Sequence, residues 1–261
     1  MLVMNQRTVH GLRMETVYYL EDYRTYRTDA DIVLFYCCGN MPDTHRHGVR
    51  TTTLLLSLEA SETALLASMR KSLRQDIARS LADPAFAVAC SNHPSCGEVD
   101  HFVEEFNRFA AAKGIMPTDP GFLHALRDRQ ALALLFVRDA SGKALCGEAD
   151  IVTPARAYGA VAFSHFRDYA GQADRNRIAR ANKLLYWEAI RNAKRRGCRL
   201  YDMGGLANGE QGADKDGIDN FKRAFGGRIA TEYDFYHART WKGRLALPLL
   251  RWMKRDMATW A

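Results

Sequence analysis

The stretch LYDMGGLANGEQGADKDGIDNFKRAFGG, residues 200–227, decides the fold prediction for this chain. It begins as a short apolar strand that runs into Asp202 and then into Gly204 and Gly205. A polar loop with several glycines follows, and it leads through Phe-Lys-Arg to a second Gly-Gly pair. Glycine allows close backbone approach and positive φ, whereas such a loop makes a poor core. We therefore expect this stretch to bring backbone and charge close to a bound group.

The segments around this stretch predict a defined order of elements. Apolar segments separated by short turns with glycine or proline indicate an antiparallel meander. They are ALALLFVR (131–138), ALCGEADIV (144–152) and YGAVAFSHF (158–166). A long helix is expected over residues 177–196, with Gly197 ending it. A helix from about Ile218 and an alternating strand over 228–238 complete the order.

The first part of the chain predicts strands and helices in a looser order. Strands are expected at 31–38, 51–59 and 86–92. Ser61 is a predicted N-cap, and helices are expected around 99–109, ended by Gly114, and around 117–129. One continuous helix is expected after Ser61, because apolar residues recur every four positions. They are Leu65, Met69, Leu73, Ile77 and Leu81.

Composition and charge bound the class of protein. The chain has 261 residues, 47% of them hydrophobic, which allows one large or two small domains. The net charge of +7 favours anionic partners such as nucleotide phosphates, tRNA or a membrane surface. The N-terminus lacks the apolar centre of a signal peptide, so we expect a cytoplasmic protein. The six cysteines are irregularly spaced, which predicts reduced thiols and no metal site, and only His45 to His47 is dense in histidine.

The predicted order of elements resembles the acyltransferase fold of the GNAT superfamily. LLYWEAIRNAKRRGCRLYDMGG (184–205) and GIDNFKRAFGG (217–227) resemble its FemABX-like branch. That branch includes peptidyltransferases that add amino acids to cell-wall precursors, and single-module relatives in glycan and natural-product pathways. The resemblance covers residues 85–240 and implies an α/β (α+β) fold with a mixed, mostly antiparallel twisted sheet flanked by helices. The expected segments are a partial GNAT-like N-terminal half (1–95), an acyltransferase domain (96–240) and a C-terminal tail (241–261).

The resemblance and the residue types together give candidate catalytic residues. Asp202, at the end of a strand, is a candidate base or acceptor for a substrate amine, or else a residue that pins the loop. Lys222 is placed to meet a phosphate or a developing negative charge, or else lies on the surface. Glu148 lies in mid-strand and alternates with Asp150, so both carboxyls share a face, as a base site or at a water-exposed edge.

His165 and Tyr201 are weaker candidates for a proton donor, and a structural role is the alternative for both. No G-x-S-x-G motif indicates a covalent nucleophile.

The resemblance also implies a cofactor site. GNAT enzymes hold a cofactor pyrophosphate on a glycine-containing loop ahead of the long helix, but the equivalent stretch here, DRNRIARAN (174–182), has no glycine. The expected donor is acyl-CoA or another acyl thioester, including one on a carrier protein, with no metal. The residues expected to bind it are Arg175, Arg177, Arg180, Gly204, Gly205, Lys222 and Arg223.

Three functions remain open at this point. The first is an N-acyltransferase that uses a thioester donor and a sugar, glycan precursor or small metabolite as the amine acceptor. The second is a Fem-type transferase that uses aminoacyl-tRNA, although such enzymes carry two complete modules. The third is a non-catalytic GNAT-like module that binds an anionic partner.

The tail RTWKGRLALPLLRWMKRDMATWA (239–261) mixes basic residues with tryptophans and leucines. This pattern is typical of an element that lies on a membrane surface, so peripheral contact with the inner face of the membrane is one interpretation. A C-terminal helix docked on the domain is the other, and the oligomeric state is open.

Overall fold

The computed structural model describes the chain except for residues 10, 44–47, 207–212 and 255–261. The dense histidine stretch and part of the glycine-rich loop therefore lie outside the described residues. The chain forms two compact units, one of residues 1–53 with 230–261 and one of residues 54–229. Each unit is described by itself.

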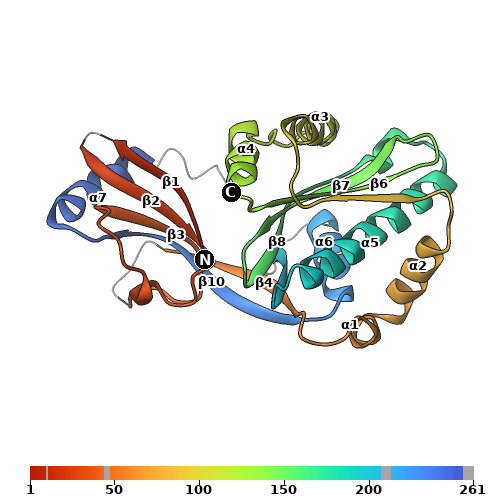
Figure 1. The fold of residues 1–261 in the computed structure, drawn as a ribbon, viewed down its shortest axis with the longest axis horizontal. Coiled ribbons are helices and arrows are strands. Elements are labelled where there is room, and N and C mark those ends of the chain that lie inside the picture. The colour runs from red at the N-terminus through yellow and green to blue at the C-terminus, as the bar shows by residue number, and fades with distance from the viewer. Residues whose placement is uncertain (10, 44–47, 207–212, 255–261) are drawn as a thin grey trace. The chain divides into compact units, whose positions relative to one another are not determined.

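In its described residues, the first unit is built on four strands and one α-helix (Figure 1). Its strand order is β1-β2-β3-β10, with β2 parallel to β3 and the other neighbours antiparallel. Val17, Phe35 and Phe235 pack on one face of this sheet, and Leu247 of the helix packs with Ile32 on the other. The elements are β1 (Leu2–Val9), β2 (Leu12–Tyr18), β3 (Ile32–Cys38), β10 (Arg228–Ala238) and α7 (Trp241–Lys254).

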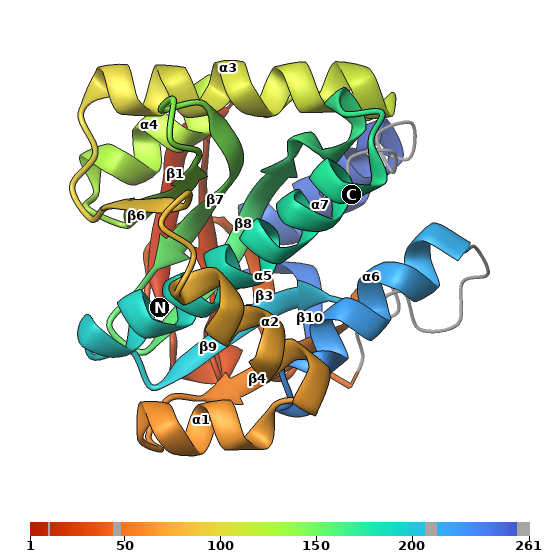
Figure 2. The ribbon, with the colours of Figure 1, turned by 90° about the vertical axis from the view of Figure 1, so that its right-hand side faces the viewer.

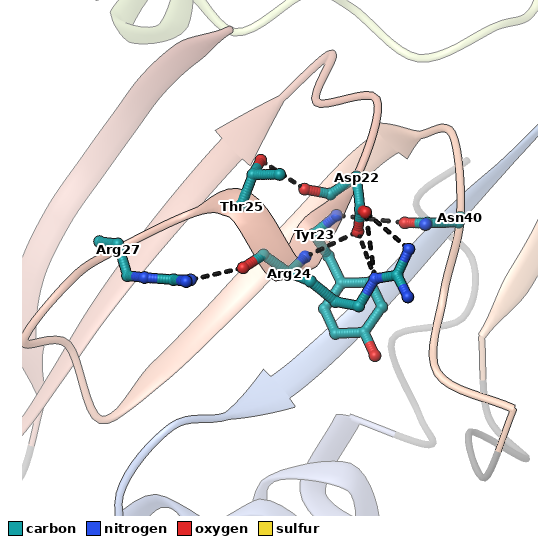
Figure 3. A network of polar contacts seen from close by, with 6 residues as sticks. All are labelled: Asp22, Tyr23, Arg24, Thr25, Arg27 and Asn40. Carbon is teal, nitrogen blue, oxygen red and sulfur yellow. Dashed lines mark hydrogen bonds and ion pairs between the residues drawn. The ribbon is translucent and has the colours of Figure 1, made fainter.

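A short 3₁₀ turn, η1 (Tyr23–Thr25), lies on the connection from β2 to β3 (Figure 3). Asp22 caps it by accepting hydrogen bonds from the backbone nitrogen and the Nε of Arg24, both at 2.9 Å. Asn40 Oδ1 accepts from the backbone nitrogen of Tyr23 at 3.1 Å. These bonds hold the Tyr23 ring edge-on against Phe235 in the core of the first unit.

The second unit holds six strands in the order β4-β9-β8-β7-β6-β5. The pairs β5–β6, β6–β7 and β7–β8 are antiparallel, which confirms the predicted meander, and β8–β9 is parallel. The sheet confirms the predicted mixed, mostly antiparallel class. Its strands are β4 (Val49–Ser57), β5 (Ala87–Ser91), β6 (Leu132–Arg138), β7 (Ala144–Val152), β8 (Arg156–Ser164) and β9 (Leu200–Gly205).

Helices cover both faces of this sheet. Helices α3 (Cys96–Lys113) and α4 (Pro120–Asp128) lie on one face of β6 and β7, and α2 (Lys71–Leu81) and α5 (Gln172–Arg195) lie on the other (Figure 1). The α5 side forms the main apolar core, because the helix buries a long stripe against strands whose residues alternate between faces. The remaining elements are α1 (Glu62–Ser68), η2 (His165–Asp168) and α6 (Ala213–Ala224).

Three predicted elements differ from the structure. The single helix after Ser61 is two helices, since Met69 and Arg70 are extended (ψ 158° and 140°), and Leu81 is 52% exposed rather than part of the buried stripe. Helix α5 begins at Gln172, ahead of the predicted 177, and α6 begins at Ala213 rather than near Ile218. Each early turn has an alanine as its sole apolar residue, so hydrophobic periodicity gave no signal there.

The two compact units divide the chain at other residues than the three predicted segments, 1–95, 96–240 and 241–261. The reason is that β10 pairs with β3 and so returns the end of the chain to its beginning. The predicted segments rest on resemblance to related proteins and stay a prediction. In the described part of the chain, no helix has the length and apolar character needed to span a bilayer. All six cysteines are free thiols.

Candidate active site

A cavity of about 620 Å³ lies where β8 and β9 diverge within the second unit. The two strands pair only from Arg156 to Tyr158 with Leu200 to Asp202. Beyond that point β8 keeps its pairing with β7, and the freed edge from Gly159 to Ser164 lines the cavity together with Met203 of β9. Residues of α3, η2, α5 and α6 complete the wall. Figure 2 shows the ribbon of α3, α5, α6, β8 and β9.

The lining of this cavity is strongly cationic. No aspartate or glutamate is found among the described residues that line it. Such a concave, one-signed surface raises the local concentration of anions. Aromatic rings line it as well, so the cavity suits a ligand with anionic groups and a planar or apolar part. The cationic residues of the lining are Lys113, Arg167, Arg175, Lys183 and Lys222.

Two of these cations lie over aromatic rings. The Arg167 guanidinium lies 4.6 Å from the ring centre of Phe166, and Lys113 Nζ lies 5.5 Å from that of Phe109. Lys183 is instead paired with Asp76 at 2.6 Å. Of the five lining cations, Lys183 is thus the one engaged in an ion pair among the described residues, while Lys113 and Arg167 lie over aromatic rings.

One face of α5 contributes Arg175 and the four residues that follow it on that face, Ala179, Asn182, Lys183 and Tyr186. Their spacing is that of one helical surface. Arg175 Nε donates to the backbone oxygen of Tyr169 at 2.7 Å, which holds the side chain over the start of the helix.

The other two predicted arginines of α5 do not line the cavity. Arg177 stacks on Phe86 and donates through Nη2 to Ala85 O at 3.3 Å, so it points toward the segment before β5. The backbone oxygen of Arg180 accepts from Ser80 Oγ of α2 at 3.3 Å. Positions two and five residues beyond Arg175 fall on other sides of a helix. Among Arg175, Arg177 and Arg180, Arg175 is therefore the one that lines the cavity and remains a candidate for binding a donor.

Lys222 lies at the wall of the cavity beside the predicted glycine pair. Its Nζ donates to the backbone oxygen of Gly205 at 2.6 Å. Gly204 has φ +79°, a conformation that glycine adopts without strain, and this turn aims the oxygen of Gly205 at the lysine. Burial lowers the pKa of Lys222, while the charge of Asp202 opposes that shift. Arg223 is exposed and is not part of the lining.

Asp202 is fully buried and does not line the cavity. It forms an ion pair with Arg156, and its Oδ1 accepts a hydrogen bond from the backbone nitrogen of Gly204 at 2.9 Å. These contacts match the alternative in which the aspartate pins the loop. In this geometry Asp202 positions the turn that carries Gly204 and Gly205.

Glu148 and Asp150 are buried side by side on β7, not at a water-exposed edge. The Tyr201 hydroxyl donates to Asp150 Oδ1 at 3.4 Å, whereas neither oxygen of Glu148 has a hydrogen-bond partner among the described residues. Burial, and then the neighbouring Asp150, raises the pKa of Glu148 well above its usual range. Burial also raises the pKa values of Asp150 and Tyr201. Tyr201 itself is outside the lining.

Glu148 lies directly behind the cavity wall at Gly159. A Cβ added to Gly159 would collide with Glu148 Oε1, and it would lie 3.4 Å from the Tyr201 hydroxyl. Gly159, which lines the cavity, must therefore be a glycine, because Glu148 fills the place of its Cβ.

His165 is buried against α3, away from the cavity lining. Its Nε2 lies 2.7 Å from Glu105 Oε2 and 2.9 Å from Arg108 Nη2. Burial lowers the pKa of His165 against the opposing effect of Glu105. These contacts give the histidine a structural role that ties η2 to α3.

Sequence reasoning missed Lys113, Arg167, Lys183 and Gly159. Lys183 follows Arg175 on the same helical face, so the periodicity of α5 would have indicated it. Lys113 and Arg167 come from elements far apart in sequence, and no local pattern signals their meeting. The described residues contain no group of three or more metal-ligating side chains placed to hold a metal ion.

Comparisons with known proteins found a family match over part of the chain and structures of similar fold. The model of the FemAB family matches residues 166–233, which span η2, α5, β9 and α6. The crystal structure of FemX is similar at a TM-score of 0.57 with 13% sequence identity, over 75% of this chain and 63% of that chain. The chain thus spans less than two thirds of FemX.

A second similar structure is the C-terminal domain of a putative lysylphosphatidylglycerol synthetase from Agrobacterium fabrum. Its TM-score is 0.52 at 14% identity, over 90% of this chain and 80% of that one. No curated protein sequence matches the chain significantly. The FemAB match and the shared fold confirm the predicted resemblance to the FemABX-like branch.

Proposed function

We propose that this protein transfers an acyl or aminoacyl group from an anionic carrier to an amine of a sugar, glycan precursor or small metabolite. The observation that carries the proposal is the cavity at the divergence of β8 and β9. Cations line it, no carboxylate is found among the described lining residues, and Lys222 lies in its wall beside the turn of the FemAB-like stretch.

The chemistry needs no covalent intermediate on the protein. The neutral amine nitrogen attacks the carbonyl carbon, a C–N bond forms, and the C–S or C–O bond to the carrier breaks. The nitrogen loses one proton, which replaces the proton that the leaving sulfur or oxygen receives. Lys222 meets the negative charge that develops on the carbonyl oxygen. Because its pKa is lowered, Lys222 is also suited to give a proton to the leaving sulfur or oxygen.

The donor we propose first is an acyl thioester, carried by coenzyme A or by a carrier protein. Arg175, Lys113 and Arg167 offer charge to its phosphates in place of the glycine loop that GNAT enzymes use. The aromatic rings of the lining suit its planar or apolar part.

Aminoacyl-tRNA is the second candidate donor. The FemAB family match over residues 166–233 and the net charge of +7 favour it. A non-catalytic role, with the same cavity binding an anionic partner, is the outcome in which neither donor reacts.

We further propose a cytoplasmic protein that contacts a membrane surface through α7. Trp241 and Leu245 of this helix are 68% and 72% exposed, which is typical of an interfacial helix. Flotation with anionic vesicles tests this, because a Trp241→Ser and Leu245→Ser variant should remain unbound.

Native mass spectrometry tests the donor site with coenzyme A, acetyl-coenzyme A and aminoacyl-tRNA added in turn. We expect one donor to bind and Lys222→Ala and Arg175→Ala to weaken it about tenfold, the loss of about one charge-assisted contact. Arg223→Ala and Arg177→Ala are matched controls, since neither side chain lines the cavity. Absence of binding by every donor, or equal loss in the controls, would overturn the proposed function.

A further inference from the structure

We propose that His165 is a positioning residue: when its ring is protonated, it fixes Arg167 in the cavity wall and so raises the affinity of the cavity for anions. The inference rests on the proposed function and deepens it, since it describes how pH controls the binding of an anionic carrier at the same cavity.

The turn η2 connects the histidine to the cavity. His165 begins the turn and is 2% exposed, Arg167 lines the cavity two residues later, and Asp168 ends the turn. Ser164, which precedes the turn, makes no side-chain cap hydrogen bond. The position of Arg167 therefore depends on the side-chain contacts at the two ends of the turn.

His165 Nε2 lies between an acceptor and a donor of α3. It is 2.7 Å from Glu105 Oε2 and 2.9 Å from Arg108 Nη2. A ring nitrogen donates when it carries a proton and accepts when it does not, so Nε2 can serve only one of these partners at a time. The protonation state of the ring therefore decides which contact is made.

Only the imidazolium attracts carboxylates at both nitrogens. Its Nε2 donates to Glu105, while Nδ1, at 3.7 Å from Asp168 Oδ2, is within ion-pair distance of the second carboxylate. Each neutral tautomer loses one of these two contacts, because one of its nitrogens carries no proton. The imidazolium thus holds the end of η2 to its beginning and the beginning to α3, with Arg167 in between.

Three charged groups face the ring from α3 and η2, namely Glu105, Arg108 and Asp168. Burial lowers the pKa of His165 against the opposing effect of Glu105 and Asp168, and Arg108 acts in the same direction as burial. The ring is therefore neutral at pH 8 and gains its proton in the acidic range.

Two further elements, β7 and α5, also pack against η2. Strand β7 places Cys146 beside the start of the turn, and burial raises the pKa of that thiol, so it stays neutral. Helix α5 places Arg175 at the backbone oxygen of Tyr169, and a guanidinium keeps its charge. Neither group changes its charge between pH 5 and pH 8, so neither masks the titration of His165.

Protonation of the ring raises anion affinity through two effects of the same sign. The new positive charge adds to the cationic lining of the cavity. The fixed turn also holds Arg167 in place, so less conformational entropy is lost when an anion binds. By reciprocity, an anion that prefers the protonated form raises the pKa of His165 by the same factor.

The test uses the full chain and isothermal titration with trimetaphosphate, an anion whose charge does not change between pH 5 and pH 8. We expect the native protein to bind it about tenfold more tightly at pH 5 than at pH 8, the scale of one charge-assisted contact. His165→Gln can still donate to Glu105 but cannot titrate, so it should keep the native affinity at pH 8 and lose most of the increase. Lys222 titrates in both proteins, so the difference between them isolates His165. His124→Gln is the matched control, because His124 pairs with Asp100 at 2.8 Å and lies outside the lining.

A second measurement needs no variant. An NMR titration of the His165 imidazole in the native protein should give a pKa about one unit higher with saturating trimetaphosphate, the equivalent of a tenfold change in affinity. An unchanged pKa, the same increase in His165→Gln as in the native protein, or no binding of the probe at either pH would overturn the inference.

Donor binding on the same proteins separates the two proposals. If a donor binds and Lys222→Ala weakens it, but His165→Gln leaves the pH dependence of trimetaphosphate binding unchanged, this inference alone fails. If trimetaphosphate binding depends on His165 but no donor binds, the proposed function alone fails. Circular dichroism confirms that each variant is folded.

Discussion

At the scale of single residues, the site combines one cation and one carboxyl in unusual settings. Lys222 is half-buried beside a backbone oxygen, and Glu148 is fully buried without a partner. Burial shifts both pKa values toward the neutral form of the side chain. The pKa shift of Lys222 can be tested by the pH dependence of activity, and that of Glu148 by the pH dependence of stability.

Removing the Lys222 charge should slow transfer. We expect Lys222→Ala to lower kcat/KM about 100-fold, the usual scale for losing one group that stabilises an oxyanion. Because burial lowers the pKa of Lys222, activity of the native protein should begin to fall at a lower pH than an exposed lysine would give. A pH–rate profile checks this, and Arg223→Ala should keep the native profile. A profile that is flat up to the range of an exposed lysine would contradict the role.

Neutralising Glu148 should stabilise the protein at alkaline pH. Since its pKa is raised, the folded chain keeps a proton that the unfolded chain has lost, so stability falls as pH rises above the ordinary carboxyl range. The slope of this loss is about 1.4 kcal/mol per pH unit while only the folded chain holds the proton. Glu148→Gln removes it, and its Tm advantage over the native chain should be larger at pH 8 than at pH 5. Equal differences at the two pH values would contradict the raised pKa of Glu148, and Glu104→Gln serves as control.

At the scale of elements, the arginines of α5 lie on different faces of the helix. Arg175 lines the cavity, and Arg177 packs on Phe86 on another side of the helix. We expect Arg175→Ala to weaken donor binding about tenfold with little change in Tm. Arg177→Ala should keep donor binding but lower Tm, because it loses packing and a hydrogen bond to Ala85. Isothermal titration and thermal melts distinguish the two, and the reverse pattern would contradict the assignment of faces.

The elements around α5 show which features of the fold and the site could be predicted from the sequence and which could not. The order of elements from β6 to β10 followed from apolar periodicity and glycine turns, which are local signals. Arg175 and Arg177 were grouped by their place in the chain, although the helical period separates them. Gly159 had no signal of its own, since its importance depends on Glu148 of the neighbouring strand, and this contact follows from strand register.

At the scale of the whole molecule, the chain carries a net charge of +7 and closes its N-terminal sheet with β10. Sequence patterns did not predict this closure, because pairing between residues some two hundred positions apart leaves no local pattern. The five cations of the lining come from α3, η2, α5 and α6, so the electrostatic character of the site is likewise a product of the tertiary fold.

The charge of the molecule predicts a salt dependence that distinguishes the two donors. If tRNA is the donor, contacts with six to ten phosphates should lower its affinity by about 10³-fold or more between 50 and 200 mM salt. Coenzyme A, with few phosphates, should lose far less. Dissociation constants measured across this range give the slope, and an affinity that does not change with salt would contradict a cationic donor site.

The most direct test is a crystal structure of the protein with the donor that native mass spectrometry finds bound. We predict that the anionic groups of the donor lie in the cavity between β8 and β9, against Arg175 and Arg167, with its acyl carbonyl beside Lys222 and Gly159. Anionic groups bound elsewhere, for example on the exposed Arg70 and Lys71 at the start of α2, would contradict the account.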